Sequence, residues 1–130
     1  MFKLEKEKTV STPYILIDEE RGYMTFEGES FPENVIRFYS DITDWIYDYL
    51  KSNFQAFTFD CKLVYFNSST SKFLLNIFTA MDEAAAEGKR VIVNWTCDSH
   101  NEIIIECAEA FAEDFPNLKF RILRKDMNPA

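Results

Sequence analysis

Glycine, cysteine and histidine are scarce in this chain, and each shortage argues against a class of function. The 130 residues include three glycines, three cysteines and one histidine. Because Gly22, Gly28 and Gly88 are isolated from one another, the chain has no glycine-rich loop to hold nucleotide phosphates, which argues against nucleotide binding of the usual kinds. The odd number of cysteines, in a chain without the apolar stretch of a secretion signal, predicts reduced thiols and a cytoplasmic location.

The few residues that could build a metal or nucleophilic site do not fit the required patterns. Cys97 and His100 supply two metal ligands, with Cys61 as a third candidate, whereas structural zinc needs four. The same two residues could form a nucleophilic pair, but no oxyanion-hole motif accompanies them. We expect Cys97 to be a core residue at a strand end and His100 to face solvent in the first turn of a helix. The chain is therefore expected to be no enzyme and to need no metal or cofactor; a small enzyme that uses Cys97 and His100 is the least favoured alternative.

Positive charge is also in short supply. Lysine and arginine number 14 against 22 aspartates and glutamates, which gives a formal net charge of −8. No basic stripe is present, so the sequence argues against nucleic acid and anionic membrane surfaces as partners. No apolar run approaches the length of a membrane span, and we expect no membrane insertion. A basic protein partner is compatible with this acidity, but net charge alone does not select one.

Apolar residues, in contrast, are abundant. Hydrophobic types make up 47% of the chain and aromatic ones 16%, which predicts a packed core rather than a disordered segment. A chain of this length suits one domain, so we expect a single domain over residues 1–130 with an ordered core from about 12 to 124. The two ends are expected to pack least.

Hydrophobic periodicity predicts an opening hairpin followed by alternating helices and strands. Two β-rich runs at 14–17 and 23–27 flank a charged turn that ends in Gly22. The elements expected after the hairpin are a helix over about 32–51, a strand over 57–66, a helix that stops at Gly88, a strand over 90–96, a helix that ends at Pro116 and a strand over 118–123. The order β-β-α-β-α-β-α-β predicts an α/β fold with a mixed, mostly parallel sheet, an N-terminal hairpin and right-handed crossovers.

Two details of these elements are specific enough to be checked against a structure. The spacings Ser30 to Glu33 and Ser99 to Glu102 fit capping boxes at the start of the first and the third helix. On the strand over 57–66, one face changes from polar to apolar toward the carboxyl end, which predicts that this end is buried on both sides.

The most informative segment follows that strand. Asn67 and the hydroxyl residues at 68–71 stand between the strand and the next helix. Backbone N–H groups in the first turn of a helix lack partners, and the helix dipole favours negative charge, so a phosphoryl group on Ser68 would meet hydrogen-bond donors. The alternative is that Ser68 or Ser69 only caps the helix. The loop over 97–101 lies at the same sheet edge, at a distance that depends on the strand order.

Four segments, taken in order, resemble one known family. They are Thr12-Pro13 at the first strand, Gly28 to Asn34 before the first helix, Leu63 to Ser69 with Lys72 at the central strand, and Trp95 followed by the helix start Asn101-Glu102. Together they resemble the SiaC family of regulatory phosphoproteins over about residues 12–124. The resemblance implies a fold similar to the STAS domains of anti-sigma-factor antagonists.

The resemblance also implies a partner-switching function. In that family a histidine-kinase-like serine/threonine kinase phosphorylates the hydroxyl residue after the asparagine, and a metal-dependent serine/threonine phosphatase removes the phosphate. The unphosphorylated protein binds and activates a diguanylate cyclase, which raises cyclic di-GMP and favours aggregation or biofilm growth. Carried onto this chain, the acceptor is Ser68, and Asn67, Ser69 and Lys72 are the nearest candidates for partner contact.

Serine at the acceptor position departs from the best-known member of the family, which has threonine there. Ser69 or Thr70 could therefore compete with Ser68 for the phosphate. Two other functions stay open, namely an anti-sigma-factor-antagonist-like protein with another effector and an interaction domain that is never phosphorylated. If the chain is a switch, phosphate adds about −1.5 to −2 charges and three acceptor oxygens, which is enough to make or break a partner surface.

Overall fold

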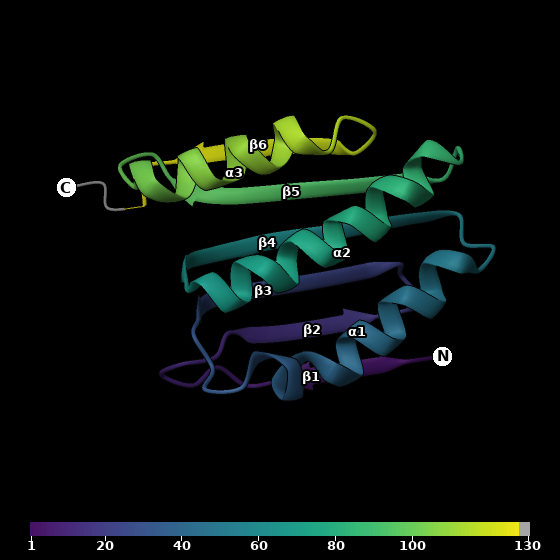
Figure 1. Cartoon of the computed structure of the whole chain (residues 1–130), viewed down its shortest axis with the longest axis horizontal. Helices are drawn as coiled ribbons and strands as arrows, with labels where there is room; N and C mark the ends of the chain where they lie inside the picture. The colour runs from purple at the N-terminus through teal and green to yellow at the C-terminus, as the bar shows by residue number, and fades with distance from the viewer. Residues whose placement is uncertain (128–130) are drawn as a thin grey trace.

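The computed structural model describes residues 1–127, which form six strands and three helices (Figure 1). In chain order these are β1 Lys3–Lys6, β2 Tyr14–Asp18, β3 Tyr23–Ser30, α1 Val35–Lys51, β4 Ala56–Phe66, α2 Ser68–Ala86, β5 Arg90–Asp98, α3 Glu102–Asp114 and β6 Lys119–Lys125. From β2 onward the order of elements is the predicted one, with boundaries shifted by a few residues. Among these helices none has both the length and the hydropathy needed to cross a membrane.

The order of the strands in the sheet follows their order in the chain, β1-β2-β3-β4-β5-β6. The first three strands pair antiparallel, and β3 to β6 pair parallel. Each helix connects a strand to its next neighbour in the same direction, so crossovers of one hand put α1, α2 and α3 on one face of the sheet, as Figure 1 shows. The α/β class, the mixed and mostly parallel sheet and the N-terminal hairpin are therefore confirmed.

Strand β1 was not predicted from the sequence. This strand pairs antiparallel with β2, with Leu4 opposite Ile17. Leu4 packs against the core, and the ring of Phe2 stacks on Trp45 with centroids 5.6 Å apart. Because charged residues alternate with the two apolar ones, this short segment looks in sequence like an exposed terminus. On an edge strand the same charges discourage pairing with a strand of another molecule.

The hydrophobic core lies between the sheet and the helices. Alternate residues of β4 and β5 point toward the helices and are at most 3% exposed: Phe57, Phe59, Cys61, Leu63, Val91, Val93, Trp95 and Cys97. The indole of Trp95 stacks on Phe111 of α3 with ring centroids 5.8 Å apart. This period of two fixes which side chains of each strand face the helices, and hence which face of the sheet the helices cover.

The opposite face of the sheet carries no helix in the described part of the chain, and its centre is polar. The Asp60 carboxylate accepts hydrogen bonds from the Tyr23 hydroxyl at 2.7 Å and from Asn94 Nδ2 at 2.9 Å. Asn94 Oδ1 in turn accepts from Arg121 Nε at 2.8 Å. This chain of hydrogen bonds crosses four neighbouring strands, which satisfies polar groups on a face that meets solvent.

The predicted burial of both sides at the carboxyl end of β4 is wrong. Val64 is 45% exposed and Tyr65 is 49% exposed. The register of β4 against β3 shifts here, since Gly28 pairs with Leu63 and Glu29 with Tyr65, which leaves Val64 as an extra residue. Such a bulge interrupts the alternation of the strand and re-aims its side chains. Apolar residues at this end therefore reach solvent.

Candidate functional site at the start of helix α2

Helices α1, α2 and α3 begin at the sheet edge where β3, β4 and β5 end, and each begins with an asparagine cap. The asparagine Oδ1 atom accepts the N–H of the residue three positions later, at 3.1 Å for Asn34, 2.9 Å for Asn67 and 3.3 Å for Asn101. Each bond satisfies one amide that the start of a helix leaves without an intrahelical partner. One edge of the molecule thus carries three helix N-termini, whose dipoles favour negative charge.

The two predicted capping boxes are wrong, because asparagine caps α1 and α3. Ser30 is the last residue of β3, and its hydroxyl is fully buried. Ser99 lies in a turn, and its backbone N–H donates to the Lys125 carbonyl at 2.7 Å. Ser30 therefore belongs to strand β3 and Ser99 to the turn after β5, and neither caps a helix.

Ser68 is the first residue of α2, and its side chain is exposed. Because Asn67 is the cap, the alternative that Ser68 or Ser69 caps the helix is wrong. Within residues 1–127 the Ser68 hydroxyl makes no hydrogen bond, so the fold does not require it. A phosphoryl group on this oxygen would lie beside backbone amides of the first turn that lack intrahelical acceptors.

The two hydroxyl residues that follow differ in exposure. Ser69 is exposed like Ser68, whereas Thr70 is fully buried. The Thr70 hydroxyl donates to the Ser30 carbonyl at 3.1 Å and lies 2.9 Å from Ser30 Oγ. A kinase would have to unfold the first turn of α2 to reach Thr70, which leaves Ser69 as the accessible competitor of Ser68.

Ser30, Tyr39 and Thr70 form a buried hydroxyl network beneath the start of α2. Ser30 Oγ lies 2.6 Å from the Tyr39 hydroxyl and 2.9 Å from Thr70 Oγ1, and the three residues are at most 1% exposed. Burial raises the pKa of Tyr39, so its hydroxyl stays protonated and able to donate. The Asn67 N–H also donates to the Ser30 carbonyl at 3.1 Å. These bonds fix the segment that carries Ser68 against β3 and α1.

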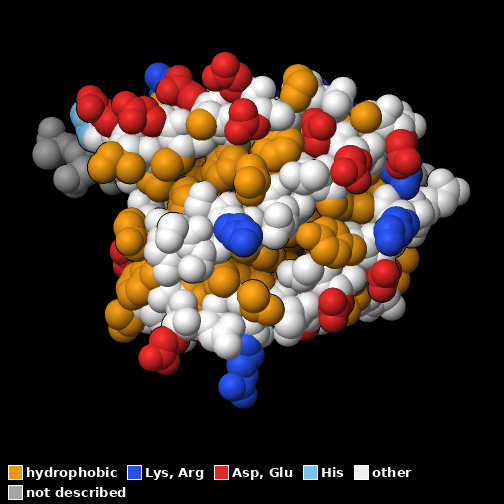
Figure 2. Space-filling model, in the orientation of Figure 1, with side chains coloured by type: hydrophobic (Ala, Val, Ile, Leu, Met, Phe, Trp, Pro, Cys, Tyr) orange, Lys and Arg blue, Asp and Glu red, His pale blue; other side chains and the backbone are white. Residues whose placement is uncertain are grey.

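A groove of about 470 Å³ opens between α1 and α2. Its floor includes the rings of Tyr39 and Phe73, which stack with centroids 4.0 Å apart. Ile36 lines the groove from α1, and Ser69 and Lys72 line it from α2. The view of this side in Figure 2 shows hydrophobic side chains gathered between the helices. The first turn of α2 therefore borders an apolar hollow.

Lys72 is exposed, and within the described residues its ammonium group has no carboxylate partner. It lies four residues after Ser68 on α2, the spacing at which two side chains are neighbours on a helix surface. Ser68 and Lys72 are thus neighbours on the surface of α2, and Ser69 and Lys72 line the groove, while the side chain of Asn67 is engaged in capping.

The loop over 97–101 lies beside this site because β4 and β5 are neighbours in the sheet. Asn101 Nδ2 donates to the Val64 carbonyl at the end of β4, at 3.2 Å. This hydrogen bond joins the start of α3 to the strand that leads into α2. The strand order, which the sequence left open, thus makes the two loops adjacent.

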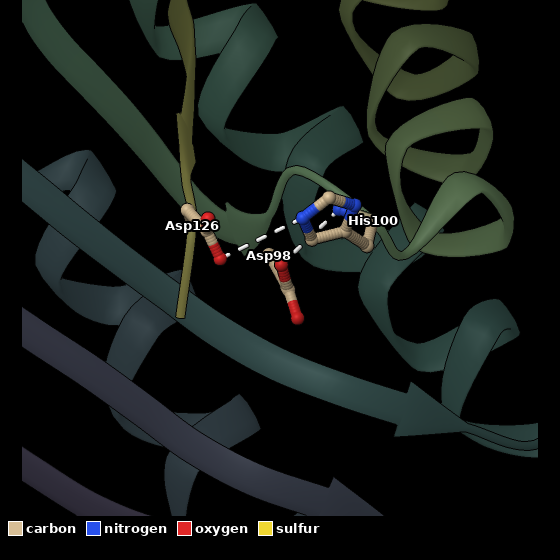
Figure 3. Close-up of side chains that lie close together, drawn as sticks. All are labelled: Asp98, His100 and Asp126. Carbon is tan, nitrogen blue, oxygen red and sulfur yellow. Dashed lines mark hydrogen bonds and ion pairs between the residues drawn. The ribbon is translucent and has the colours of Figure 1, made fainter. Parts of the chain in front are cut away.

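Cys97 and His100 do not form a reactive pair. Cys97 is 2% exposed, as expected for a core residue at a strand end, and burial raises the pKa of its thiol. His100 faces solvent as expected, but it lies in the turn before Asn101 rather than in the first turn of α3. Its Nε2 atom is 3.6 Å from Asp126 Oδ1, and Asp98 completes a cluster that excludes Cys97 (Figure 3). Exposed acidic groups commonly gather in this way without an ion, so the cluster is given no function.

Sequence reasoning missed two exposed isoleucines at the same edge. Ile36 is 81% exposed and Ile103 is 75% exposed, and each is the second residue of its helix. The signal that could have found them is their position, since both stand outside the apolar stripes that face the core. Apolar residues outside such a stripe are left largely exposed to solvent.

Comparison with known proteins gives a family for this chain. A family model described as "SiaC family regulatory phosphoprotein" matches residues 6–125. An uncharacterized protein of Pseudomonas aeruginosa strain UCBPP-PA14 is 34% identical over 106 residues, which cover 82% of this chain and 84% of that protein.

Solved structures from Pseudomonas aeruginosa share the fold over nearly the whole chain. The crystal structure of apo-SiaC superposes with a TM-score of 0.85 at 30% identity, covering 96% of this chain and 99% of that chain. A crystal structure of the diguanylate cyclase SiaD in complex with its activator SiaC gives a TM-score of 0.84 at 31% identity, with 93% and 97% of the two chains covered.

Proposed function

This chain belongs to the SiaC family of regulatory phosphoproteins, and we propose that it is a phosphorylation-controlled activator of a diguanylate cyclase. In this scheme a histidine-kinase-like serine/threonine kinase phosphorylates Ser68, and a metal-dependent serine/threonine phosphatase removes the phosphate. The unphosphorylated chain binds and activates the cyclase. The observation that carries the proposal is an exposed Ser68 hydroxyl, without a hydrogen bond to any of residues 1–127, in the first turn of a helix that borders an apolar groove.

The surroundings of Ser68 support its role as the acceptor. Asn67 caps α2, so modification of Ser68 does not remove a cap. The amides of the first turn and the dipole of α2 would stabilise a phosphate there, and the buried hydroxyl network holds the turn in place. Phosphorylation therefore changes the surface of the protein without a need to unfold it.

Phosphate at this position would prevent docking through charge and solvation. It adds about −1.5 to −2 charges and a strong hydration shell. A partner that approaches the groove between α1 and α2 would have to strip water from that dianion or meet its repulsion. Docking therefore favours the unphosphorylated chain.

Ser69 and Lys72 are proposed as partner contacts next to Ser68, and Asn67 as a residue that orients them. Lys72 is an exposed cation in a chain of net charge −8, so a partner carboxylate has a place to bind at the rim of the groove. A phosphate on Ser68 lies one helical turn from Lys72 and would compete for the same ammonium group. Phosphorylation would thus add an anion and engage a cation in one step.

Binding of the purified cyclase to Ser68 variants tests the proposal. Ser68→Ala is expected to bind and activate the cyclase like the unphosphorylated wild type, and Ser68→Glu to bind at least tenfold more weakly. Thr79→Glu is the matched control, because it adds the same charge to an exposed position of α2 far from its start. Equal affinity of wild type, Ser68→Ala and Ser68→Glu would remove the scheme.

The acceptor itself is tested with the kinase. Incubation with ATP is expected to phosphorylate the wild type and Ser69→Ala, but not Ser68→Ala. If Ser69→Ala abolished the modification instead, the switch would stand and the site would move by one residue.

A further inference from the structure

The edge that carries Ser68 exposes three large apolar side chains, although the ring of Tyr65 packs edge-on against Phe31 with centroids 5.8 Å apart. Ile36 is 81% exposed, Ile103 75% and Tyr65 49%. Isoleucine is among the residues most often buried, and its branched Cβ slightly disfavours helix. Ile36 and Ile103 stand in the first turns of α1 and α3, the helices on either side of α2, and apolar groups that gather at one edge mark an interaction site.

These three residues surround the start of α2. Ile36 lines the same groove as Ser69, and Tyr65 lines a shallow pocket together with Asn67. Ile103 lies two residues after the cap of α3, which is hydrogen-bonded to the end of β4. Hydrophobic side chains also line the edge where the helices begin, on the left of Figure 2.

We propose that Ile36, Tyr65 and Ile103, which we call the apolar rim, form the docking surface for the diguanylate cyclase, with Ser68 at its centre. This inference rests on the proposed function and adds the surface and its chemistry. The rim would take an apolar patch of the cyclase, because its three members offer hydrocarbon and one phenol ring to solvent. Aromatic and aliphatic anchors surrounded by polar residues are the usual composition of such a patch.

A second copy of this chain suits the rim poorly. Pairing two rims across a two-fold axis would bring the start of α2 against its own equivalent, together with the N-termini of α1 and α3. Like ends of helix dipoles would then face each other, in a protein that carries a net charge of −8. A different partner meets neither obstacle.

The position of Ser68 inside the rim gives the phosphate its effect. Docking onto Ile36 and Ile103 excludes water from the edge, and a phosphate at its centre would have to lose its hydration against an apolar surface. The first-turn amides hold that phosphate in place rather than releasing it to one side. Phosphorylation of the Ser68 hydroxyl would therefore prevent docking on the whole apolar rim.

The test measures cyclase affinity for Ile36→Ser, Ile103→Ser and the double variant, all unphosphorylated. Both isoleucines are largely exposed, so the melting curves are expected to stay close to that of the wild type. Each single variant is expected to bind about tenfold more weakly and the double variant about 100-fold, as for the loss of one and two buried isoleucine contacts. Leu75→Ser is the matched control; this leucine is 42% exposed but lies two turns along α2, and its change is expected to alter affinity less than twofold.

The outcomes separate this inference from the proposed function. Wild-type affinity of both isoleucine variants, with Ser68→Glu still at least tenfold weaker, would overturn the rim and leave the switch intact. Wild-type affinity of Ser68→Glu would overturn the switch itself. Slower phosphorylation with unchanged cyclase affinity would assign the rim to the kinase and reject the inference. A wild-type dimer in light scattering that dissociates in the variants, again with cyclase affinity unchanged, would assign it to self-association and reject it equally.

Discussion

Apolar side chains pack against one another at one end of the sheet and are exposed at the other. At the end where α1 finishes, Phe2, Trp45, Tyr49 and Phe54 stack in a continuous row, with successive ring centroids 5.6, 4.8 and 4.9 Å apart. At the end where the helices begin, the residues of the apolar rim stand largely in solvent.

The polar groups at the two ends of the sheet also differ in whether they have partners. Beside the aromatic row, the Trp45 indole N–H donates to Glu19 at 2.7 Å. Lys89 Nζ donates to the Leu50 carbonyl at 2.6 Å and lies over the Phe54 ring. Ser68 and Lys72, at the other end, make no such contacts within residues 1–127. The polar groups beside the aromatic row thus have partners within the chain, whereas Ser68 and Lys72 meet solvent and stay available to a partner.

The largest expected difference in the free energy of unfolding is between Trp45→Ala and Ile36→Ala. Trp45 is 8% exposed and stacked on both sides, so its truncation is expected to lower the free energy of unfolding by about 3–5 kcal/mol. Ile36→Ala is expected to change the free energy of unfolding by less than about 0.5 kcal/mol, since this side chain is largely exposed and makes few contacts. Urea denaturation measures both. A comparable loss for the two variants would show that the rim is part of the folding core.

A smaller effect is expected where the site is anchored. Thr70→Val keeps the shape of the side chain and removes the hydroxyl that bonds Ser30, so the free energy of unfolding should fall by about 1–3 kcal/mol. The rate at which the kinase phosphorylates this variant should also change, because the first turn of α2 loses a hydrogen bond to β3. Unchanged stability together with an unchanged phosphorylation rate would mean that the network does not position Ser68. Thr79→Val, at an exposed position of the same helix, controls for the change of residue type.

The sequence was sufficient for the parts of the fold that depend on periodicity. Phe57, Phe59 and Leu63 alternate with polar residues, so β4 and its inner face could be predicted. β1 could not, because Lys3 and Glu5 flank its one apolar residue, Leu4, in a strand too short to show a period.

The helix caps and the apolar rim could not be predicted fully from the sequence. Serine and asparagine cap helices about equally well, so spacing favoured Ser30 and Ser99 while the chain uses Asn34 and Asn101. Ser68 could be singled out because hydroxyl residues after a strand are a local signal. Ile36 could be seen to stand outside the apolar stripe of α1, but its place at one edge with Ile103 depends on the strand order, which no local pattern contains.

Removal of the α2 cap should lower the free energy of unfolding by less than the loss of the Thr70 hydroxyl does. Asn67→Ala is expected to cost about 1 kcal/mol of unfolding free energy, because the Thr70 N–H loses its acceptor. Asn67→Asp keeps an acceptor oxygen and should restore most of that loss. Thermal melts measure both, and a larger loss in the aspartate variant than in the alanine variant would contradict this account of the cap.

The smallest expected effect concerns Lys72. Lys72→Ala should change stability by less than about 0.5 kcal/mol, since the side chain is exposed and unpaired among the described residues. On the phosphorylated chain, the second pKa of the phosphate should be lower in the wild type than in Lys72→Ala, because a nearby cation favours the dianion. Phosphorus NMR titration measures this difference. Identical titration curves would mean that Lys72 does not contact the phosphate.

The most direct test of the switch is phosphosite mass spectrometry on the protein purified from its native host, with and without the phosphatase. The account predicts that phosphate accumulates on Ser68 when the phosphatase is absent, and that Thr70 stays unmodified because it is buried. An unmodified segment 67–72 in both strains, with the kinase demonstrably expressed, would contradict the account and leave Ser68 as an ordinary first residue of a helix.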